Sequence, residues 1–283
     1  MDFVAPDIAA IDARIRALES CIETTRPVDK DEFLHVGVDL GTAYIVVVVL
    51  NAAKEPVACA LEFAQVVRDG LVVDYIGATR IVRRLAGQLE ERLGRRLTHA
   101  AIAVPPGTGV KDSATHRHVV EGAGLEVSAI LDEPTAANAV LGLDNGVIVD
   151  IGGGTTGLSV LEEGRVAYVA DEATGGTHLT LVLAGNYGLP FEEAEELKKD
   201  PARQDEILSV VRPVLQKMGT IVRRHVEGRN VRSVHLVGGT CCLRGMEDVI
   251  ARETGLPVYK PANPLLVTPL GIALNCREGG HEY

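Results

Sequence analysis

The first thirty residues carry a helical pattern of apolar positions. Apolar residues recur there at intervals of three and four, with charged residues between them: Ile8, Ile11, Ile15, Leu18 and Ile22. The spacing predicts an amphipathic helix that begins after Pro6 and Asp7, and Pro27 within the charged run 24–32 predicts a tether behind it. The apolar stripe needs a partner, and the pattern leaves two open: the helix docks on its own domain, or it binds a groove of another protein.

From residue 34 onward, short β-branched runs alternate with stretches of helical periodicity. Residues 36–50 predict a hairpin that turns at Gly41 and Thr42, and residues 67–75 predict another strand segment with a turn at Asp69 and Gly70. Further strands are expected within 99–106, 124–131 and 147–173, and helices at 76–93, at 111–122 and from Asp132 onward. This alternation indicates an α/β fold.

One short motif occurs twice. Asp39 and Asp150 each stand at the end of an apolar strand, two residues before a glycine, and Thr42 and Thr155 follow shortly after. The two aspartates lie 150 − 39 = 111 residues apart, which is long enough for one copy per domain. The repeat therefore predicts two similar domains that face each other, each with a turn pointing into a shared cleft.

The residue types in these turns suit a phosphate ligand. Glycine lets the backbone approach a ligand closely and present successive N–H groups, so an oligophosphate can be bound without many lysines. Aspartates beside phosphates repel them unless a divalent cation lies between, and the motif therefore implies Mg²⁺ held through coordinated waters.

A third glycine-rich segment follows a strand at residues 234–250. It has the order strand, Gly238-Gly239, helix. This order suits a site in which the nucleoside or its sugar packs against the backbone. The chain has no GxxxxGK[ST] motif and no GxGxxG motif followed by an acidic residue, so the other common phosphate-binding folds lose support.

Composition excludes several classes of function. The 283 residues are 46% hydrophobic, which is enough for a sizeable core, and disorder is excluded as the main state. Aromatic residues are 4% with no Trp, and 28 Lys and Arg against 39 Asp and Glu give a net charge of −11. Neither stacking platforms nor a basic surface is indicated, so nucleic acid is not an expected partner.

The sequence also argues against export and membrane insertion. Asp2 and Asp7 stand where a leader would carry basic residues, and the longest apolar run, 43–50, has eight residues, far short of the roughly twenty that a membrane helix needs. Five cysteines without a CxxC pair indicate neither a disulfide framework nor a zinc site. A cytoplasmic protein with reduced thiols is expected.

Five motifs in order resemble the actin-like ATPase superfamily, in particular the nucleotide-binding domain of Hsp70 chaperones. These segments are VGVDLGT (36–42), DEPTAANAVLGL (132–143), VIVDIGGGTT (147–156), VHLVGGT (234–240) and LLVTPLGIAL (265–274). The resemblance covers roughly residues 34–276 and implies an actin-like, ribonuclease H-like fold with two similar domains flanking a nucleotide cleft. One domain would comprise residues 31–145 and 270–283, and the other would comprise residues 146–269, which include the nucleoside motif. The helix and tether of residues 1–30 would precede both domains.

The resemblance assigns roles to matching residues, with ATP or ADP and Mg²⁺ as ligands. Asp39 and Asp150 would hold the Mg²⁺ water shell from opposite sides of the cleft, and Glu133 would orient the attacking water; these three are the candidate catalytic residues. The residues that would contact the nucleotide are Gly41, Thr42, Gly152, Gly153, Gly154, Thr155, Gly175, Gly176, Gly238 and Gly239.

Several positions depart from the Hsp70 pattern. Ala43 and Tyr44 follow the first phosphate motif where Hsp70 has polar residues, and Gly157 stands where the second motif usually ends in an acidic residue. No match is found to the catalytic lysine, or to the Glu and Lys pair that clamps adenine. The charged run 192–200 instead predicts an exposed helix face with opposite charges four apart. Nucleotide binding is therefore better supported than hydrolysis, which is expected to be slow or lost.

Chain length and residues 175–200 resemble a compact bacterial branch, the ethanolamine-utilisation proteins encoded with microcompartment genes. That resemblance implies an ATP-driven chaperone or an assembly or reactivation factor, whose client is a microcompartment enzyme or shell protein. Association with bacterial microcompartments follows from the same resemblance. Two alternatives remain: a pseudo-ATPase scaffold or adaptor, and a small-molecule kinase of the same superfamily.

Overall fold

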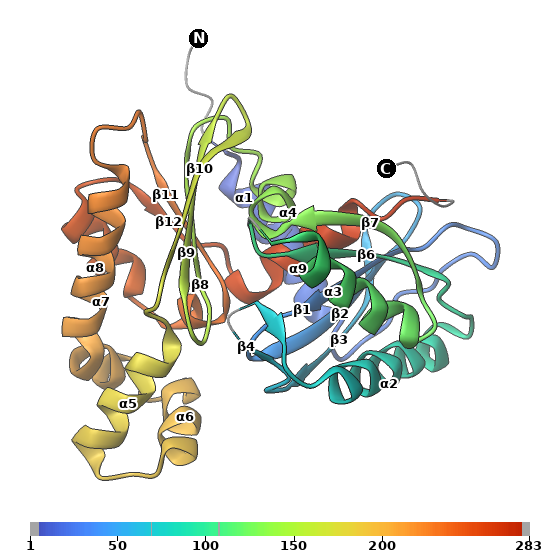
Figure 1. Ribbon diagram of the computed structural model, residues 1–283, viewed down its shortest axis with the longest axis horizontal. Coiled ribbons are helices and arrows are strands. Elements are labelled where there is room, and N and C mark those ends of the chain that lie inside the picture. Colours follow the sequence, from blue (N-terminus) through green and yellow to red (C-terminus); the bar gives the residue numbers. More distant parts are fainter. Residues whose placement is uncertain (1–5, 69, 107, 279–283) are drawn as a thin grey trace. The chain divides into compact units, whose positions relative to one another are not determined.

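The computed structural model describes residues 6–68, 70–106 and 108–278, without the side chains of residues 110–112, and it divides into two compact units (Figure 1). Unit 1 comprises Met1–Gly142 and Leu266–Tyr283, and unit 2 comprises Leu143–Leu265. The chain thus leaves unit 1 once and returns to it. The N-terminal helix belongs to unit 1.

Unit 1 contains a five-stranded sheet in the order β3-β2-β1-β6-β7. β1 pairs antiparallel with β2, and β2 with β3, whereas β6 and β7 run parallel to β1. The strands are β1 (His35–Leu40), β2 (Tyr44–Leu50), β3 (Pro56–Phe63), β6 (His99–Val104) and β7 (Glu126–Asp132), and a small ribbon consists of β4 (Val67–Arg68) and β5 (Leu71–Val72).

Unit 2 contains a second five-stranded sheet in the order β10-β9-β8-β11-β12. β8, β9 and β10 form antiparallel pairs, and β11 and β12 run parallel to β8. The strands are β8 (Gly146–Ile151), β9 (Thr156–Glu162), β10 (Arg165–Glu172), β11 (Val234–Val237) and β12 (Val258–Tyr259).

The two sheets repeat one another in order and in hairpin register. Asp39 is paired with Val46, and Asp150 is paired with Gly157, so both partners shift by the same 111 residues (150 − 39 and 157 − 46). Each aspartate is the fifth of six residues in its strand. The α/β class and the two similar units predicted from the repeated motif are confirmed.

The helices of unit 1 cover its sheet and are packed closely at glycine positions. A Cβ at Gly37 of β1 would lie 2.5 Å from the Ala273 nitrogen, and a Cβ at Gly271 would overlap the Ala136 carbonyl oxygen. α9 therefore packs on β1 and α4 at distances that only glycine permits. The helices are α1 (Ile8–Ser20), α2 (Tyr75–Leu93), α3 (Val110–Gly122), α4 (Glu133–Leu141) and α9 (Val267–Leu274), the last preceded by the 3₁₀ turn η2 (Pro264–Leu266).

The helices of unit 2 pack on one face of its sheet around a long central helix. α7 buries an apolar residue at each turn, including Ile207, Val211, Leu215 and Val222, against Val147, Val149 and Leu236 of the strands. The helices are α5 (Gly176–Tyr187), α6 (Phe191–Lys199), α7 (Gln204–Val226) and α8 (Met246–Thr254), with a 3₁₀ turn η1 (Gly239–Cys242). No helix in the described part of the chain is both long enough and apolar enough to cross a membrane.

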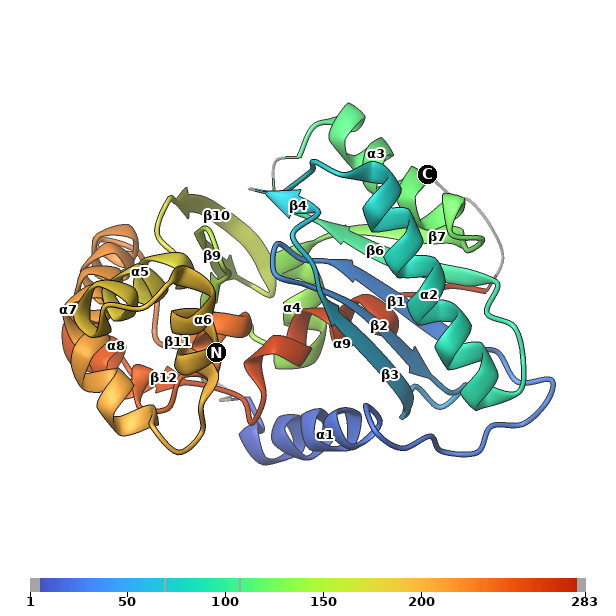
Figure 2. The same ribbon diagram turned by 90° about the horizontal axis from the view of Figure 1, so that it is seen from below.

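The predicted N-terminal helix is docked on its own unit. Ile15 and Leu18 of α1 are fully buried, and α1 packs beside β3 (Figure 2). The chain behind the helix reaches the outer edge of β3, where Cys59 donates its N–H to the Cys21 carbonyl at 3.0 Å and Arg26 donates its N–H to the Val57 carbonyl at 2.9 Å. Of the two alternatives left open by the sequence, the structure therefore contains the docked helix.

Most predicted elements are confirmed, and four were not predicted. The hairpin turns at residues 41–43, and the predicted helices correspond to α2, α3 and α4. Asp69, one of the predicted turn residues at 67–75, lies outside the described residues. β3, α5, α7 and β12 had no counterpart in the prediction.

Candidate functional site

In unit 2 the second glycine-rich motif forms a tight turn between β8 and β9. Gly152 donates its N–H to the Thr155 carbonyl at 3.0 Å, which closes the turn directly after the strand that carries Asp150. A side chain at Gly238 would collide with Oδ1 of Asp150. One carboxylate oxygen of Asp150 therefore lies directly beside Gly238. The residues of the second and third glycine motifs are thus in contact, as their predicted roles require.

The N-terminus of α5 rests on this turn. Gly176 donates its N–H to the Gly152 carbonyl at 2.9 Å, and Thr177 donates its N–H to the Gly153 carbonyl at 2.8 Å. A Cβ at Gly175 would lie 2.6 Å from the Gly154 carbonyl carbon, so the contact depends on glycine. The predicted pair Gly175 and Gly176 therefore supports the turn at 152–155 and adds the positive end of a helix dipole beside it.

The third glycine-rich segment is joined to the same turn. The Thr240 hydroxyl donates to the Gly152 carbonyl at 2.8 Å, and Gly238, at a φ of 91°, donates its N–H to the Pro264 carbonyl at 3.1 Å. Gly239 and Thr240 open the 3₁₀ turn η1. One hydroxyl thus links the candidate nucleoside segment to the candidate phosphate turn.

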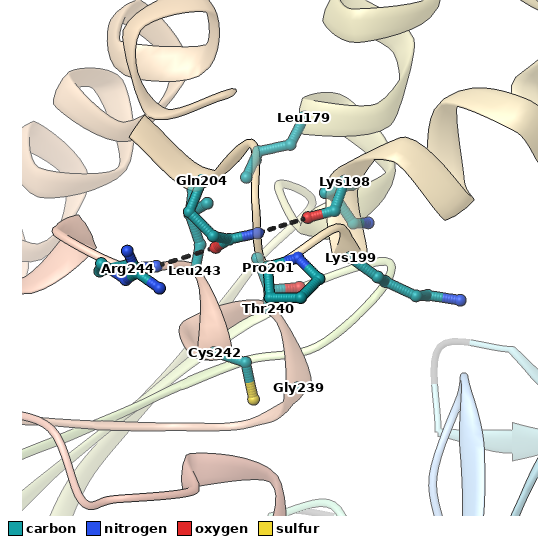
Figure 3. Close-up of a pocket in the computed structure, with 10 residues that line it drawn as sticks. All are labelled: Leu179, Lys198, Lys199, Pro201, Gln204, Gly239, Thr240, Cys242, Leu243 and Arg244. Carbon is teal, nitrogen blue, oxygen red and sulfur yellow. Dashed lines mark hydrogen bonds between the residues drawn. The ribbon is translucent and has the colours of Figure 1, made fainter. Parts of the chain in front are cut away.

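A pocket of about 280 Å³ lies beside Gly239 and Thr240, wholly within unit 2 (Figure 3). Its remaining lining comes from α5, α6, the start of α7 and the segment after η1: Leu179, Lys198, Lys199, Pro201, Gln204, Cys242, Leu243 and Arg244. Three of these side chains are cationic, although the chain as a whole is acidic. Two of them, Lys198 and Lys199, form ion pairs with Glu195 and Glu196, and the third is Arg244.

Lys198 is held in this wall by a network of hydrogen bonds. Its ammonium donates to Glu195 Oε2 at 2.6 Å, to the Thr180 hydroxyl at 2.9 Å and to the Gly176 carbonyl at 3.3 Å. Burial lowers the pKa of Lys198, against the opposing effect of Glu195. Burial alone raises the pKa of Glu195, but the charge and hydrogen bonds of Lys198 outweigh it and hold that pKa below its ordinary value.

This network corrects one prediction. The helix within residues 192–200 is confirmed as α6, but a solvated charged face is wrong for Glu195 and Lys198, whose side chains are only 20% and 14% exposed. Glu195 and Lys198 therefore form a partly buried Glu–Lys pair at a pocket, for which the sequence alone offered no match. Their spacing of three residues is also that of an ordinary exposed helical pair, so spacing could not identify them.

Gln204 stabilises the side of the pocket that faces α7. Its amide nitrogen donates to the Lys198 carbonyl at 3.2 Å and to the Asp200 carbonyl at 2.9 Å, and its amide oxygen accepts from the Arg244 N–H at 3.2 Å (Figure 3). These bonds connect the end of α6, the start of α7 and the segment after η1. The pocket is consequently preformed rather than assembled by a loop.

Asp150 carries the most distinctive electrostatics of the predicted residues. Desolvation by the surrounding protein raises its pKa from 3.8 to about 6, and the negative charge of Asp171 adds to the shift. Asp171 lies in β10 and is in register with Gly157, which is also the partner of Asp150, so the two aspartates flank a residue without a side chain. A bound cation would relieve both effects.

The predicted residues of unit 1 gather at one edge of its sheet. Asp39 lies near the end of β1, Gly41 and Thr42 connect β1 to β2, and Glu133 begins α4 directly after β7. β1, β6 and β7 run parallel in that order, so these residues lie at the carboxyl ends of the strands, where α/β proteins bind ligands. A Cβ at Gly41 would lie 2.7 Å from the Tyr44 carbonyl oxygen, so the turn requires glycine.

The helix that carries Glu133 begins with a strong N-cap. The Asp132 carboxylate accepts the Thr135 N–H and the Thr135 hydroxyl, both at 2.8 Å. These bonds fix the backbone at the start of α4. The N-cap residue of the helix is therefore Asp132 and not Glu133. In the described part of the chain no group of three or more His, Cys, Asp or Glu side chains could by itself hold a metal ion.

Comparison with known proteins agrees with this geometry. The chain is 48% identical to the ethanolamine utilization protein EutJ of Salmonella typhimurium, over 91% of this chain and 90% of that protein. It is also similar to the crystal structure of EutJ from Carboxydothermus hydrogenoformans, with a TM-score of 0.90, 49% identity and coverage of 95% and 99% of the two chains. The chain belongs to the EutJ family. The recognition of the ethanolamine-utilisation proteins from sequence is confirmed.

More distant similarities show the fold. The family model for Hsp70 protein matches residues 73–180, and that for type IV pilus assembly protein PilM matches residues 134–266. MreB 5 of Spiroplasma citri, solved bound to AMPPNP, has a TM-score of 0.68 at 16% identity over 87% of this chain and 96% of its own. The EutJ-family chain therefore has the actin-like ATPase fold that its motifs predicted.

Proposed function

We propose that this EutJ-family protein binds ATP or ADP with Mg²⁺, with the nucleoside in the unit 2 pocket and the phosphates at the adjacent turn of residues 152–155. The observation that carries the proposal is the direct link between the two, the Thr240 hydroxyl bonded to the Gly152 carbonyl at 2.8 Å. A pocket of nucleoside size and a glycine-rich turn are thus two halves of one binding surface.

The phosphates are bound by backbone rather than by a lysine. Gly153, Gly154 and Thr155 offer main-chain donors, and the N-terminus of α5 adds its partial positive charge. In unit 1, Gly41 and Thr42 would offer further main-chain donors to the phosphates at the carboxyl edge of the sheet.

Magnesium fits the residues that would hold it. Asp39 and Asp150 carry carboxylate oxygens, the ligand type that Mg²⁺ prefers, and they would hold the ion through coordinated waters. When bound, the ion neutralises phosphate charge. Asp150 would then stay ionised despite its raised pKa, and Glu133 would orient a water beside the terminal phosphate.

The nucleoside is recognised by the cationic wall of the pocket. Lys198 lines the pocket and is held there by Glu195, and Lys199 and Arg244 line it with further basic side chains. Gly239 lets a ring lie against backbone. The pair supplies the Glu and Lys function that Hsp70-like proteins use at adenine.

At the level of the cell, we propose an ATP-driven chaperone or reactivation factor for the enzymes of ethanolamine utilisation in bacterial microcompartments. Membership of the EutJ family and the match to the Hsp70 model support this role. Nucleotide binding would bias the chain between conformations that differ in their grip on a client protein.

Thermal denaturation and phosphate release test these proposals together. Full-length protein is heated with ADP or ATP, with and without Mg²⁺, and free phosphate is measured alone and with candidate microcompartment enzymes. Stabilisation by nucleotide and client-stimulated release support the full proposal. Stabilisation without release would contradict the ATP-driven role in favour of an adaptor, release that requires a metabolite would favour a kinase, and no effect of any nucleotide would overturn the binding site.

A further inference from the structure

Two cysteines meet where the N-terminal segment joins the sheet of unit 1. Cys21 is the C-cap residue of α1, and Cys59 lies in β3, the edge strand of the sheet; both are free thiols. The Cys59 N–H donates to the Cys21 carbonyl at 3.0 Å. The two positions lie 59 − 21 = 38 residues apart in the chain, so their proximity is a product of the fold.

The main-chain bond limits the distance between the two α-carbons. Standard bond lengths place a carbonyl oxygen about 2.4 Å from its own α-carbon and an amide nitrogen about 1.5 Å from its own. Together with the 3.0 Å bond they give an upper limit of about 7 Å for atoms in a straight line, and the bend at the carbonyl oxygen shortens it. Because the α-carbons of disulfide-bonded cysteines usually lie about 4.4–6.8 Å apart, the backbone spacing suits a disulfide.

The two side chains lie in the same layer, between α1 and the sheet. Side chains alternate along a strand, so Cys59 faces away from its neighbours Ala58 and Ala60, which pack into the core with α2. Figure 2 shows α1 and α2 on opposite sides of β3, so Cys59 is on the α1 side. Cys21 follows Leu18 by three residues and continues the buried face of α1. Both cysteines are fully buried.

The charges around the two thiols favour Cys21 as the one that reacts first. Burial raises the pKa of Cys59 to about 12, and Cys21 adds to that rise, against the positive charge of Arg92. Burial also raises the pKa of Cys21, but the charges of both Arg26 and Arg92 oppose that rise. The thiolate is the nucleophile in disulfide exchange, and nearby cations stabilise it. Cys21 therefore suits the attacking role, and Cys59 the resolving role.

We propose that Cys21 and Cys59 form a disulfide when the protein meets a low-molecular-weight disulfide, and that this bond fixes the N-terminal segment to the sheet. The Cys21 thiolate attacks one sulfur of the reagent, forms a mixed disulfide and releases one reagent thiol. The Cys59 thiolate then attacks the Cys21 sulfur and releases the second reagent thiol. The protein loses two hydrogen atoms, and the reagent is reduced to two thiols.

The bond adds a covalent tie to contacts that are otherwise non-covalent. The Arg92 guanidinium donates to the Cys21 carbonyl at 2.7 Å and to the Cys59 carbonyl at 3.0 Å, and Arg26 donates its N–H to the Val57 carbonyl at 2.9 Å. All of these residues belong to unit 1, whereas the pocket of the proposed function lies within unit 2. The disulfide therefore controls the attachment of the N-terminal segment and does not depend on the proposed function.

Peptide mapping of the folded full chain after treatment with oxidised glutathione tests the pairing. The Cys21–Cys59 peptide is expected to be about tenfold or more as abundant as any other cysteine pair, because the fold sets the spacing of this one. The excess should disappear when the chain is treated in urea. Cys242 is exposed and should carry glutathione, which shows that the reagent is active. Absence of the Cys21–Cys59 peptide from folded chain in which Cys242 has reacted, or equal abundance of all pairs, would overturn the proposal.

Two serine variants separate the resolving thiol from another buried thiol of unit 1. Cys59→Ser should stop the reaction at the mixed disulfide on Cys21, whereas Cys276→Ser should leave the cross-link intact. Circular dichroism confirms that each variant is folded. The cross-link should raise the melting temperature of the wild type by several degrees, because it restricts the unfolded chain between residues 21 and 59, and treated Cys59→Ser should show no such rise. A cross-linked protein that melts at the temperature of the reduced one would contradict a bond that fixes the segment.

Discussion

At the scale of single residues, Asp150 is the most informative side chain. Its pKa is raised from 3.8 to about 6, mainly because the protein removes it from water. The folded state therefore holds this proton more tightly than the unfolded state does. The associated stability is present below pH 3.8 and is lost as the pH rises toward 6.

Replacing Asp150 is expected to change stability and ligand binding in opposite directions. Asp150→Asn removes the cost of a desolvated charge and should stabilise the ligand-free protein at pH 7 by about 2 kcal/mol or less. The same change should weaken Mg²⁺-dependent nucleotide binding, because the carboxylate is lost. Urea unfolding between pH 4 and 8 is the measurement, and a stability loss between pH 4 and 6 that persists in the variant would contradict the assigned pKa.

The residue scale also shows what a sequence can reveal about a site. Asp39, Asp150 and their glycines are candidates from the sequence because the same pattern occurs twice at a constant offset. Lys198 and Glu195 were not found, because charged residues three apart on a polar helix look the same whether they are solvated or packed. The pair is part of a pocket wall because Thr180 and Gly176 of α5 form hydrogen bonds with Glu195 and Lys198 of α6.

At the scale of elements, the N-terminal helix is a structural part of unit 1. Leu18 is fully buried in α1, and Leu18→Ala should destabilise the protein by about 2–5 kcal/mol. Arg16→Ala, two residues away on the exposed face, should change stability by less than about 0.5 kcal/mol. Chemical denaturation compares the two, and equal small effects would mean that the helix is only loosely attached.

Glycines at helix contacts allow a second test at this scale. Gly271→Ala places a methyl group where the Ala136 carbonyl lies, so α9 and α4 must separate, and a loss of about 1–3 kcal/mol or more is expected. Gly87→Ala in α2 meets no atom within 4 Å and should stabilise the protein by up to about 1 kcal/mol. Thermal melts of the two variants should therefore shift in opposite directions, and a shared direction would contradict the close packing of α9.

The elements that the sequence analysis did not predict share no single physical reason, since α7 has a regular helical spacing of buried apolar residues. β3 contains Ala and Cys in place of β-branched residues, and it is stabilised by β2 and the segment behind α1 rather than by its own propensity. Strands and helices with strong periodicity, such as β1, β8 and α2, were predictable within a few residues. Register and edge contacts depend on residues far apart in the chain, and a local pattern does not contain them.

At the scale of the whole molecule, the two units repeat one sheet order and differ in the elements that surround it. Unit 1 has the N-terminal segment bonded to the edge of β3 and an acidic residue at the start of α4, and unit 2 has the pocket lined by α5, α6 and η1. In the proposed function, unit 2 alone would bind the nucleoside, whereas both units would supply glycine-rich turns. The proposed function depends on unit 2 more heavily than the symmetric motifs suggest.

Calorimetric titration of the full chain with ATP and Mg²⁺, repeated with Lys198→Met, tests the central claim most directly. The account predicts that wild-type protein binds one nucleotide per chain and that Lys198→Met weakens binding by about tenfold or more, because a pocket cation and its hydrogen bonds are lost. Lys217→Met, at an exposed position of α7 outside the pocket, should bind as the wild type does. Absence of binding by the wild type, or equal affinity in all three proteins, would contradict the account.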